Sequence, residues 1–230
     1  MSAVGQSHSM LDAQERVSGR IDYALNVELP GMLVGRILRS PLPHARIMAL
    51  DTTRADRLAG VGAVLSRDDF GLTSGYSGTY GRIFRDQSVV ALDKVRFVGD
   101  PVAAVAAVNE DVAEEALALI RLDYEELPAV FDEEEALKPG APLVHDPRPQ
   151  QQPVFSKLIQ DLPPGTNVCS HFKLRRGDVE SGFRESDFIF EDIFRSPAAQ
   201  HVALEPHVTV AQFVEGKLTL WTSTQMPHAV

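Results

Sequence analysis

Two runs near the C-terminus, Val208–Phe213 and Lys217–Thr222, flank the turn pair Glu215-Gly216. The first run is rich in β-branched and aromatic residues, and the second alternates polar and apolar residues with the period of a strand. This pattern predicts two antiparallel strands with one face in a core. Small polar residues follow in Ser223–His228, with a proline where a helix could begin. Because α/β proteins place sites where strands end before helices, the pattern indicates a site at this point.

A second pattern lies in the middle of the chain. The continuous run of small apolar residues Val102–Val108 predicts a strand that is covered on both faces. The apolar stripe over Val112–Ile120 predicts a helix, and Asp111 could cap its start. Ile120–Glu126 alternates again as a strand. Strand, helix and strand in so few residues are typical of a βαβ-like unit, which Leu127-Pro128 would close.

Shorter patterns surround this unit. Strands are predicted for Ile21–Val27, Met32–Arg39, Arg46–Leu50, Val61–Leu65 and Val95–Val98. A short helix is predicted over Arg54–Leu58, an irregular loop over Phe70–Asp86, and a solvated helix start at Glu133–Glu135.

The segment Ala141–Gly165 contains six prolines, a density at which neither strand nor helix patterns survive. It predicts a linker between two domains. After it, alternation predicts strands over Val168–Arg175 and Asp187–Arg195, separated by a short helix that ends near Phe183.

Composition limits the classes of function. The chain has 230 residues, is 44% hydrophobic and carries a formal charge of −10, which permits one large or two smaller domains. Binding to nucleic acid is not expected, because phosphate needs a basic face. The single cysteine, Cys169, cannot form an internal disulfide, and no apolar run is long enough to cross a bilayer. The polar N-terminus does not resemble a secretion signal, so a cytoplasmic location is expected.

Histidine spacing does not favour a zinc site. His201 and His207 are six residues apart and separated by a proline, which fits neither one helix face nor a compact zinc turn. His44 lies between two predicted strands, where a packing or hydrogen-bonding role is expected. We therefore predict no metal ligand from this chain.

Three other features have a chemical and a structural interpretation. The glycines of Gly71–Gly81 neither precede a lysine nor follow a clean strand, so a phosphate loop is not predicted. Glu205 is the best candidate for a general acid or base, although a carboxylate near a strand start more often hydrogen-bonds backbone amides. Cys169 is expected to be a small strand hydrophobe rather than an activated thiol. No catalytic residue is assigned in this chain.

Several segments resemble one known family. Leu33–Pro41 with His44–Ile47, then Asp93–Ala103, then Asp123–Pro128 are similar, in this order, to the α/β hammerhead domain of the xanthine dehydrogenase and aldehyde oxidase family. Glu205–His207 and Trp221–His228 resemble the opening of the same family's molybdopterin-binding subunit.

The resemblance implies an α+β fold, with an α/β hammerhead domain followed by the first β-hairpins of a molybdopterin-binding domain. The expected boundaries are an N-terminal arm at 1–16, the hammerhead domain at 17–140, the Pro-rich linker at 141–166 and an incomplete cofactor domain at 167–230.

The resemblance also implies a cofactor and partners. In the family, the glutamine after Ser-Thr approaches the molybdenum centre, and Gln225 matches it. A molybdenum-pterin cofactor is therefore expected, with iron–sulfur (2Fe-2S) clusters and FAD in partner subunits. The family's Gly-Gly-Phe-Gly stretch, later pterin contacts and catalytic glutamate have no counterpart here. The chain is thus expected to act with a remaining molybdopterin-binding chain and to be inactive alone.

The implied reaction is hydroxylation of an N-heteroaromatic or aldehyde substrate with oxygen derived from water. The residues at Thr166–Phe172 and Leu204–His207 resemble purine or other N-heteroaromatic hydroxylases, while carbon monoxide, aldehyde or aryl-CoA members stay open. The alternative is a non-catalytic scaffold or assembly subunit, or a truncated remnant, that keeps the hammerhead fold.

Overall fold

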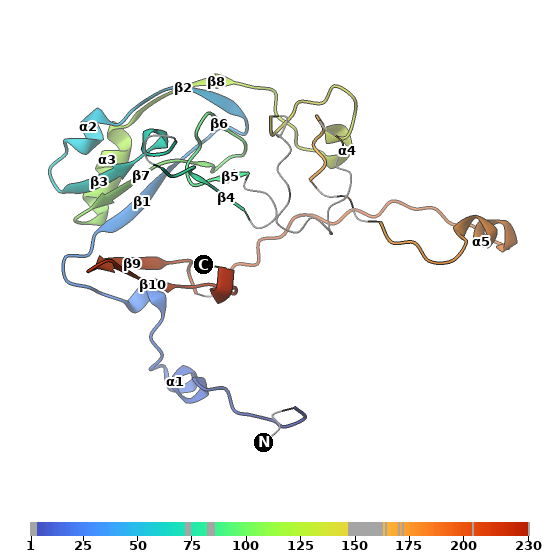
Figure 1. The fold of residues 1–230 in the computed structure, drawn as a ribbon, viewed down its shortest axis with the longest axis horizontal. Coiled ribbons are helices and arrows are strands. Elements are labelled where there is room, and N and C mark those ends of the chain that lie inside the picture. Colours follow the sequence, from blue (N-terminus) through green and yellow to red (C-terminus); the bar gives the residue numbers. More distant parts are fainter. Residues whose placement is uncertain are drawn as a thin grey trace. The chain divides into compact units, whose positions relative to one another are not determined.

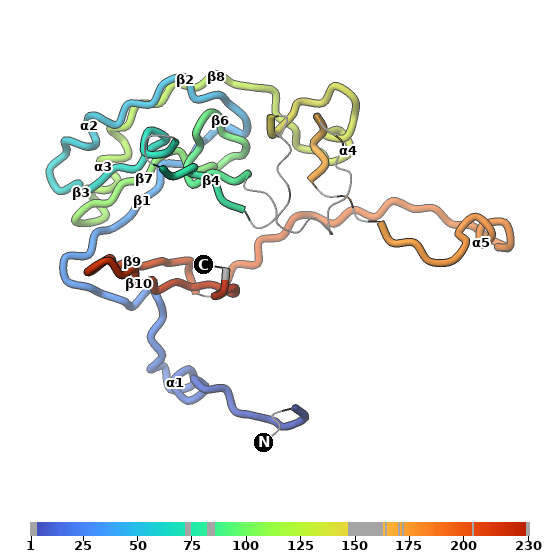
Figure 2. The backbone as a smooth tube through the Cα atoms, in the orientation of Figure 1, coloured from blue at the N-terminus to red at the C-terminus, as the bar shows by residue number. Residues whose placement is uncertain are grey.

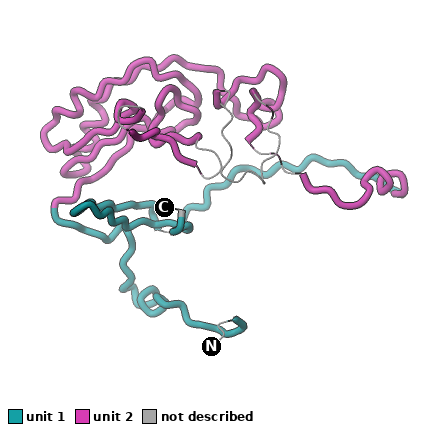
Figure 3. Tube along the Cα trace, viewed as in Figure 1, with its two compact units in different colours: residues 1–30, 187–230 teal, residues 31–186 magenta. Residues whose placement is uncertain are grey.

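The computed structural model describes residues 4–71, 75–81, 86–146, 163, 165–169, 171, 173–203 and 205–229 (Figures 1 and 2). The chain divides into two compact units, one formed by residues 31–186 and the other by residues 1–30 with 187–230 (Figure 3). The expected mixture of helices and small sheets is confirmed. Among the described residues, no helix has the length and apolar character that crossing a bilayer requires.

The first sheet of residues 31–186 has β7 (Pro101–Ala107) between β1 (Val34–Arg39) and β3 (Val61–Leu65). Both pairings are antiparallel. Val102 belongs to one buried cluster, whereas Val105 and Ala107 belong to the other. Because alternate residues of a strand point to opposite faces, β7 is covered on both sides, as predicted.

Helix α3 (Glu110–Leu119) lies against this sheet (Figure 1). Its small residues Ala113 and Ala116 are buried in one cluster with Val105 and Ala107 of β7. The side chain of Asn109 caps the helix by accepting a hydrogen bond from the Val112 amide at 2.9 Å. The prediction that Asp111 caps it was wrong, because Asp111 lies inside the first turn. There its carboxylate interacts with the positive end of the helix dipole instead.

The second sheet has β2 (Ala45–Asp51) between β6 (Lys94–Val95) and β8 (Arg121–Glu126), again with antiparallel pairs. The strand, helix and strand of the predicted βαβ-like unit are present as β7, α3 and β8, but the two strands belong to different sheets. Both edges of β7 are occupied by β1 and β3, so β8 pairs with β2 in the other sheet.

Short elements complete this unit. They are α2 (Thr53–Asp56), η2 (Arg67–Asp69), β4 (Thr79–Tyr80), β5 (Gln87–Ser88), α4 (Glu133–Ala136) and α5 (Val179–Glu185). The predicted helices near residues 54, 133 and 179 are confirmed. The ribbon of β4 and β5, two residues from each strand, was not predicted. Strand β4 lies within the predicted irregular loop Phe70–Asp86, and β5 directly follows it.

Residues 1–30 and 187–230 form the other unit, which contains α1 (Ala13–Ser18), η1 (Ala24–Asn26), β9 (Thr209–Val214), β10 (Lys217–Thr222) and η3 (Pro227–Ala229). The predicted hairpin is confirmed. The prediction of a strand over Ile21–Val27 was wrong, because this segment contains the short helix η1. The N-terminal arm before it contains α1.

Two more predicted strands, Val168–Arg175 and Asp187–Arg195, are absent from the described residues of those segments. Alternation favours a strand only when a neighbouring strand supplies hydrogen bonds, and none pairs with them here. As a result, Phe188, Phe190 and Phe194 are largely exposed. The linker predicted over Ala141–Gly165 lies mostly outside the described residues, and its boundaries remain a prediction.

Candidate functional site

The β9–β10 hairpin has a turn that sets its register. Glu215 and Gly216 have φ angles of 51° and 78°, both in the left-handed region. Two such residues in succession are typical of a type I′ turn, whose twist matches that of the flanking strands. The register then places Trp221 opposite Val210 and Thr222 opposite Thr209. The hydroxyl oxygens of Thr222 and Thr209 lie 2.7 Å apart, which joins the strands at the end remote from the turn.

Ser223 extends this connection beyond the last strand pair. Its amide donates to the Val208 carbonyl at 3.2 Å, and its hydroxyl accepts a hydrogen bond from the Val208 amide at 3.1 Å. The same hydroxyl lies 3.2 Å from the carbonyl of Pro206, to which it can donate. Ser223 therefore holds the segment after β10 against the segment before β9. The sequence showed Ser223 only as one of several small polar residues, because these partners lie 15 and 17 residues away.

Gln225 follows this anchored point. The amide of Met226 donates to the hydroxyl of Thr224 at 3.1 Å, and the turn leads into η3 at Pro227. The side chain of Gln225 is exposed, and none of the hydrogen bonds found among the described residues involves it. A free carboxamide next to a fixed strand end is suited to donate a hydrogen bond to a group outside this chain.

The loop before β9 brings together residues that the sequence analysis weighed separately. The rings of His201 and His207 lie 6.0 Å apart between centroids, tilted by 35°. Among the described residues, no group of three or more potential ligands could hold a metal ion. Glu205 is half-buried. The hydrogen bond to Asp12 raises the pKa of Arg16, and the charge of Glu205 is the smallest of the causes that act on it.

Two other predictions concern residues of the unit formed by residues 31–186. Cys169 is exposed and outside any strand, so its interpretation as a strand hydrophobe was wrong. His44 is 8% exposed, and its Nδ1 lies 2.7 Å from the Pro128 carbonyl oxygen, which confirms the expected packing and hydrogen-bonding role.

Two family models match the chain. Residues 18–128 match the model described as "Aldehyde oxidase and xanthine dehydrogenase, a/b hammerhead domain", and residues 161–230 match the "Molybdopterin cofactor-binding domain". The second match includes the hairpin, Ser223 and Gln225.

Among similar proteins, a probable xanthine dehydrogenase subunit of Bacillus subtilis (strain 168) is 35% identical over 216 residues. This alignment covers 93% of the chain and 26% of the relative. The nicotinate dehydrogenase large molybdopterin subunit of Eubacterium barkeri is 34% identical over 226 residues, covering 98% of the chain and 48% of the relative. The chain thus spans between a quarter and a half of the length of these relatives.

Solved structures share the fold. The crystal structure of the Cu,Mo-CO dehydrogenase in its carbon monoxide reduced state matches with a TM-score of 0.76 and 31% identity, covering 97% of this chain and 28% of that one. Quinoline 2-oxidoreductase from Pseudomonas putida 86 matches with a TM-score of 0.75 and 30% identity, covering 98% and 27%. In both comparisons the similarity extends over both units of the chain.

Proposed function

Because the chain belongs to the xanthine dehydrogenase and aldehyde oxidase family, we propose that it forms the hammerhead domain and the first cofactor-domain strands of a molybdenum hydroxylase. The observation that supports this most directly is the exposed carboxamide of Gln225 beyond the anchored end of β10. It lies in the segment that matches the cofactor-binding model. The proposed domain boundaries are 17–140 for the hammerhead domain, 141–166 for the linker and 167–230 for the start of the cofactor domain.

The residues after β10 can supply one hydrogen bond to a cofactor whose other contacts would come from outside this chain. The side-chain amide of Gln225 has no hydrogen-bond partner in the part of the chain that the structure describes and can donate, and its backbone position depends on the hydrogen bonds of Ser223. When bound, the molybdenum-pterin group would supply the redox chemistry of the hydroxylation. Gln225 would hold a hydrogen bond toward the metal centre and orient the reacting group there. A preformed donor of this kind stabilises charge that develops in the transition state.

The remaining parts of the enzyme would come from other polypeptides or domains. We propose a remaining molybdopterin-binding chain, an iron–sulfur (2Fe-2S) subunit and an FAD subunit as partners, in the cytoplasm. Relatives whose names include the word subunit support a multi-subunit assembly. An N-heteroaromatic or aldehyde compound is the proposed substrate, and the names xanthine dehydrogenase, nicotinate dehydrogenase and quinoline 2-oxidoreductase favour the heteroaromatic class.

The test is Gln225→Ala in the assembled complex. Loss of one preorganised donor costs about 2 to 4 kcal/mol at the barrier, so turnover per bound molybdenum should fall roughly 30-fold to 1,000-fold. Assembly and molybdenum content should remain near wild type, because the side chain is exposed and makes no hydrogen bond among the described residues. The measurement is steady-state turnover normalised to molybdenum by elemental analysis.

Two control variants distinguish loss of turnover at the site from loss of folded hairpin. Gln212→Ala makes the same change at an exposed position of β9 and should leave turnover per molybdenum unchanged. Trp221→Ala removes a partly buried side chain of β10 and should reduce the yield of folded complex rather than its turnover per metal. Wild-type turnover per molybdenum in Gln225→Ala would remove Gln225 from the site and favour the scaffold alternative.

A further inference from the structure

Residues 188–194 form an exposed apolar segment between α5 and β9 (Figure 1). Its large apolar side chains are between 61% and 91% exposed, and they belong to Phe188, Ile189, Phe190, Ile193 and Phe194. Within the part of the chain that the structure describes, the backbone of this segment makes no hydrogen bond and no strand pairs with it. A contiguous group of exposed apolar side chains marks an interaction surface.

The sequence of the 188–194 segment is that of a strand. In a strand, Phe188, Phe190 and Phe194 would share one face, because side chains an even number of residues apart point the same way. Ile189 and Ile193 would lie on the opposite face. Aromatic and β-branched residues form a strand only where a neighbouring strand supplies hydrogen bonds and packing. The segment therefore has the pattern of a strand and lacks the neighbour.

The unit that contains this segment does not complete a sheet among its described residues. Its strands there are β9 and β10, which form one hairpin. A two-stranded hairpin is marginally stable alone, and a stable sheet needs three or more strands or a covering helix. Phe213 and Leu218, which face each other across the hairpin, are 71% and 57% exposed. The part of the chain that matches the cofactor-binding model thus requires strands from elsewhere.

The remaining molybdopterin-binding polypeptide is large enough to supply these strands. The chain spans 26% of one relative and 48% of another, so each relative contains further polypeptide beyond the part that this chain matches.

A second copy of the chain fits the segment less well. Glu191 and Asp192 lie at the middle of the segment, and pairing two copies about this point brings their carboxylates together. Like charges on directly opposed residues of paired strands are destabilising. Charge therefore favours a different polypeptide over self-association.

We propose that the 188–194 segment binds the remaining molybdopterin-binding chain by adding a strand to one of its sheets. Backbone hydrogen bonds to the sheet edge hold the segment, and Phe188, Phe190 and Phe194 enter the apolar core beneath it. This inference rests on the proposed function, which supplies the partner.

The test is hydrogen–deuterium exchange, read by mass spectrometry, on the full 230-residue chain alone and in the assembled complex. The amides of residues 188–194 should exchange at least about tenfold more slowly in the complex, because paired strands protect them. Helix α3 is already packed within its own unit and should exchange equally in both samples. Unchanged exchange of the segment in the complex overturns the proposal, as does protection that accompanies dimerisation of the chain alone.

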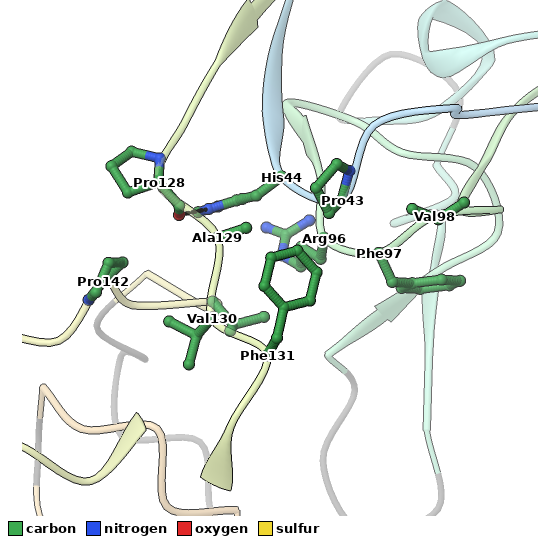
Figure 4. Close-up of a pocket in the computed structure, with 11 residues that line it drawn as sticks. Pro43, His44, Arg96, Phe97, Val98, Pro128, Ala129, Val130, Phe131 and Pro142 are labelled. Carbon is green, nitrogen blue, oxygen red and sulfur yellow. Dashed lines mark hydrogen bonds between the residues drawn. The ribbon is translucent and has the colours of Figure 1, made fainter. Parts of the chain in front are cut away.

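Two variants measure the contribution of the phenylalanine side chains. Phe190→Ser should raise the concentration at which the complex dissociates at least about 30-fold, as loss of a buried aromatic anchor predicts. Phe131→Ser makes the same change in the unit formed by residues 31–186, where Phe131 lines a cavity (Figure 4), and should have no effect.

The two rings are 86% and 83% exposed, so neither variant should change the thermal unfolding temperature of the chain alone. Analytical ultracentrifugation of a dilution series measures the dissociation. Equal effects of the two variants overturn the proposal.

A cross-link identifies the chain that covers the segment. Replacing Phe190 with the photoreactive p-benzoylphenylalanine should attach the segment, on irradiation of the complex, to the remaining molybdopterin-binding chain. Attachment to the iron–sulfur subunit, to the FAD subunit or to a second copy overturns the proposal. None of these measurements depends on turnover. Wild-type turnover in Gln225→Ala would therefore reject the proposed site and leave this interface standing, whereas an unprotected 188–194 segment would reject the interface alone.

Discussion

At the scale of single residues, Asp100 shows how burial and hydrogen bonding oppose each other. Asp100 is 8% exposed, and its carboxylate accepts a hydrogen bond from the Arg96 backbone amide at 2.9 Å. Burial raises the pKa of this carboxyl above its ordinary value, although the Arg96 amide lowers it. The charged form is therefore less favourable in the folded chain than in the unfolded chain. The free energy of unfolding should rise as the pH falls through the folded pKa.

Asp100→Asn should stabilise the fold at pH 7, because an amide oxygen can still accept from the Arg96 amide while the buried charge is removed. The expected gain is at most about 1 kcal/mol. It should disappear near pH 3, where the wild-type carboxyl is protonated as well. Urea unfolding at both pH values measures the difference.

Asp93→Asn is the control, because this exposed carboxylate contacts the same arginine at 3.3 Å. It should give no gain at either pH, as expected for a surface ion pair. A loss of stability in Asp100→Asn at pH 7 would mean that attraction to Arg96 outweighs burial of the charge.

At the scale of elements, helix α3 depends on a cap that pattern reasoning placed two residues too late. Asn109→Ala removes the acceptor for the Val112 amide and should lower the free energy of unfolding by about 1 kcal/mol. Asp111→Ala, at the position that the sequence favoured, should change it by less than about 0.5 kcal/mol, because alanine's helix propensity offsets the lost dipole interaction. Urea denaturation of both variants gives the ranking, and the reverse order would contradict the observed cap.

At the scale of the whole molecule, the Pro-rich segment remains the predicted site of first cleavage. Proline-rich backbone has few amide donors and opens readily, so limited proteolysis should cut first between Ala141 and Gly165. The structure indicates where the N-terminal fragment ends, because Lys94 pairs with Asp146 at 3.0 Å. We expect an N-terminal fragment that includes Asp146, because its ion pair with Lys94 holds it to the folded part. First cuts between Val95 and Pro128, located by mass spectrometry, would contradict the proposed boundary.

Asn167 provides a test of whether the fragments produced by limited proteolysis stay associated. Its side-chain amide donates to the carbonyls of Ala136 at 3.2 Å and Pro142 at 2.9 Å and accepts from the Val144 amide at 3.0 Å. The cleaved pieces should therefore stay together on size exclusion, and Asn167→Ala should make them separate more easily. Identical elution of cleaved wild type and cleaved variant would assign the association to other contacts.

The sequence by itself determined the elements whose patterns are local. The β9–β10 hairpin follows from alternation and the Glu215-Gly216 turn, and the buried strand β7 follows from its small apolar residues. Gln225 was identified by resemblance to a family, and its approach to the cofactor remains a prediction. Only the tertiary structure decided that β8 pairs with β2, that Asn109 caps α3 and that Ser223 links the segments before and after the hairpin. Periodicity indicates which side of an element is apolar, because it depends only on neighbouring residues. Strand pairing and hydrogen bonds between distant residues depend on which strand edges and donors are still available once the other elements have packed.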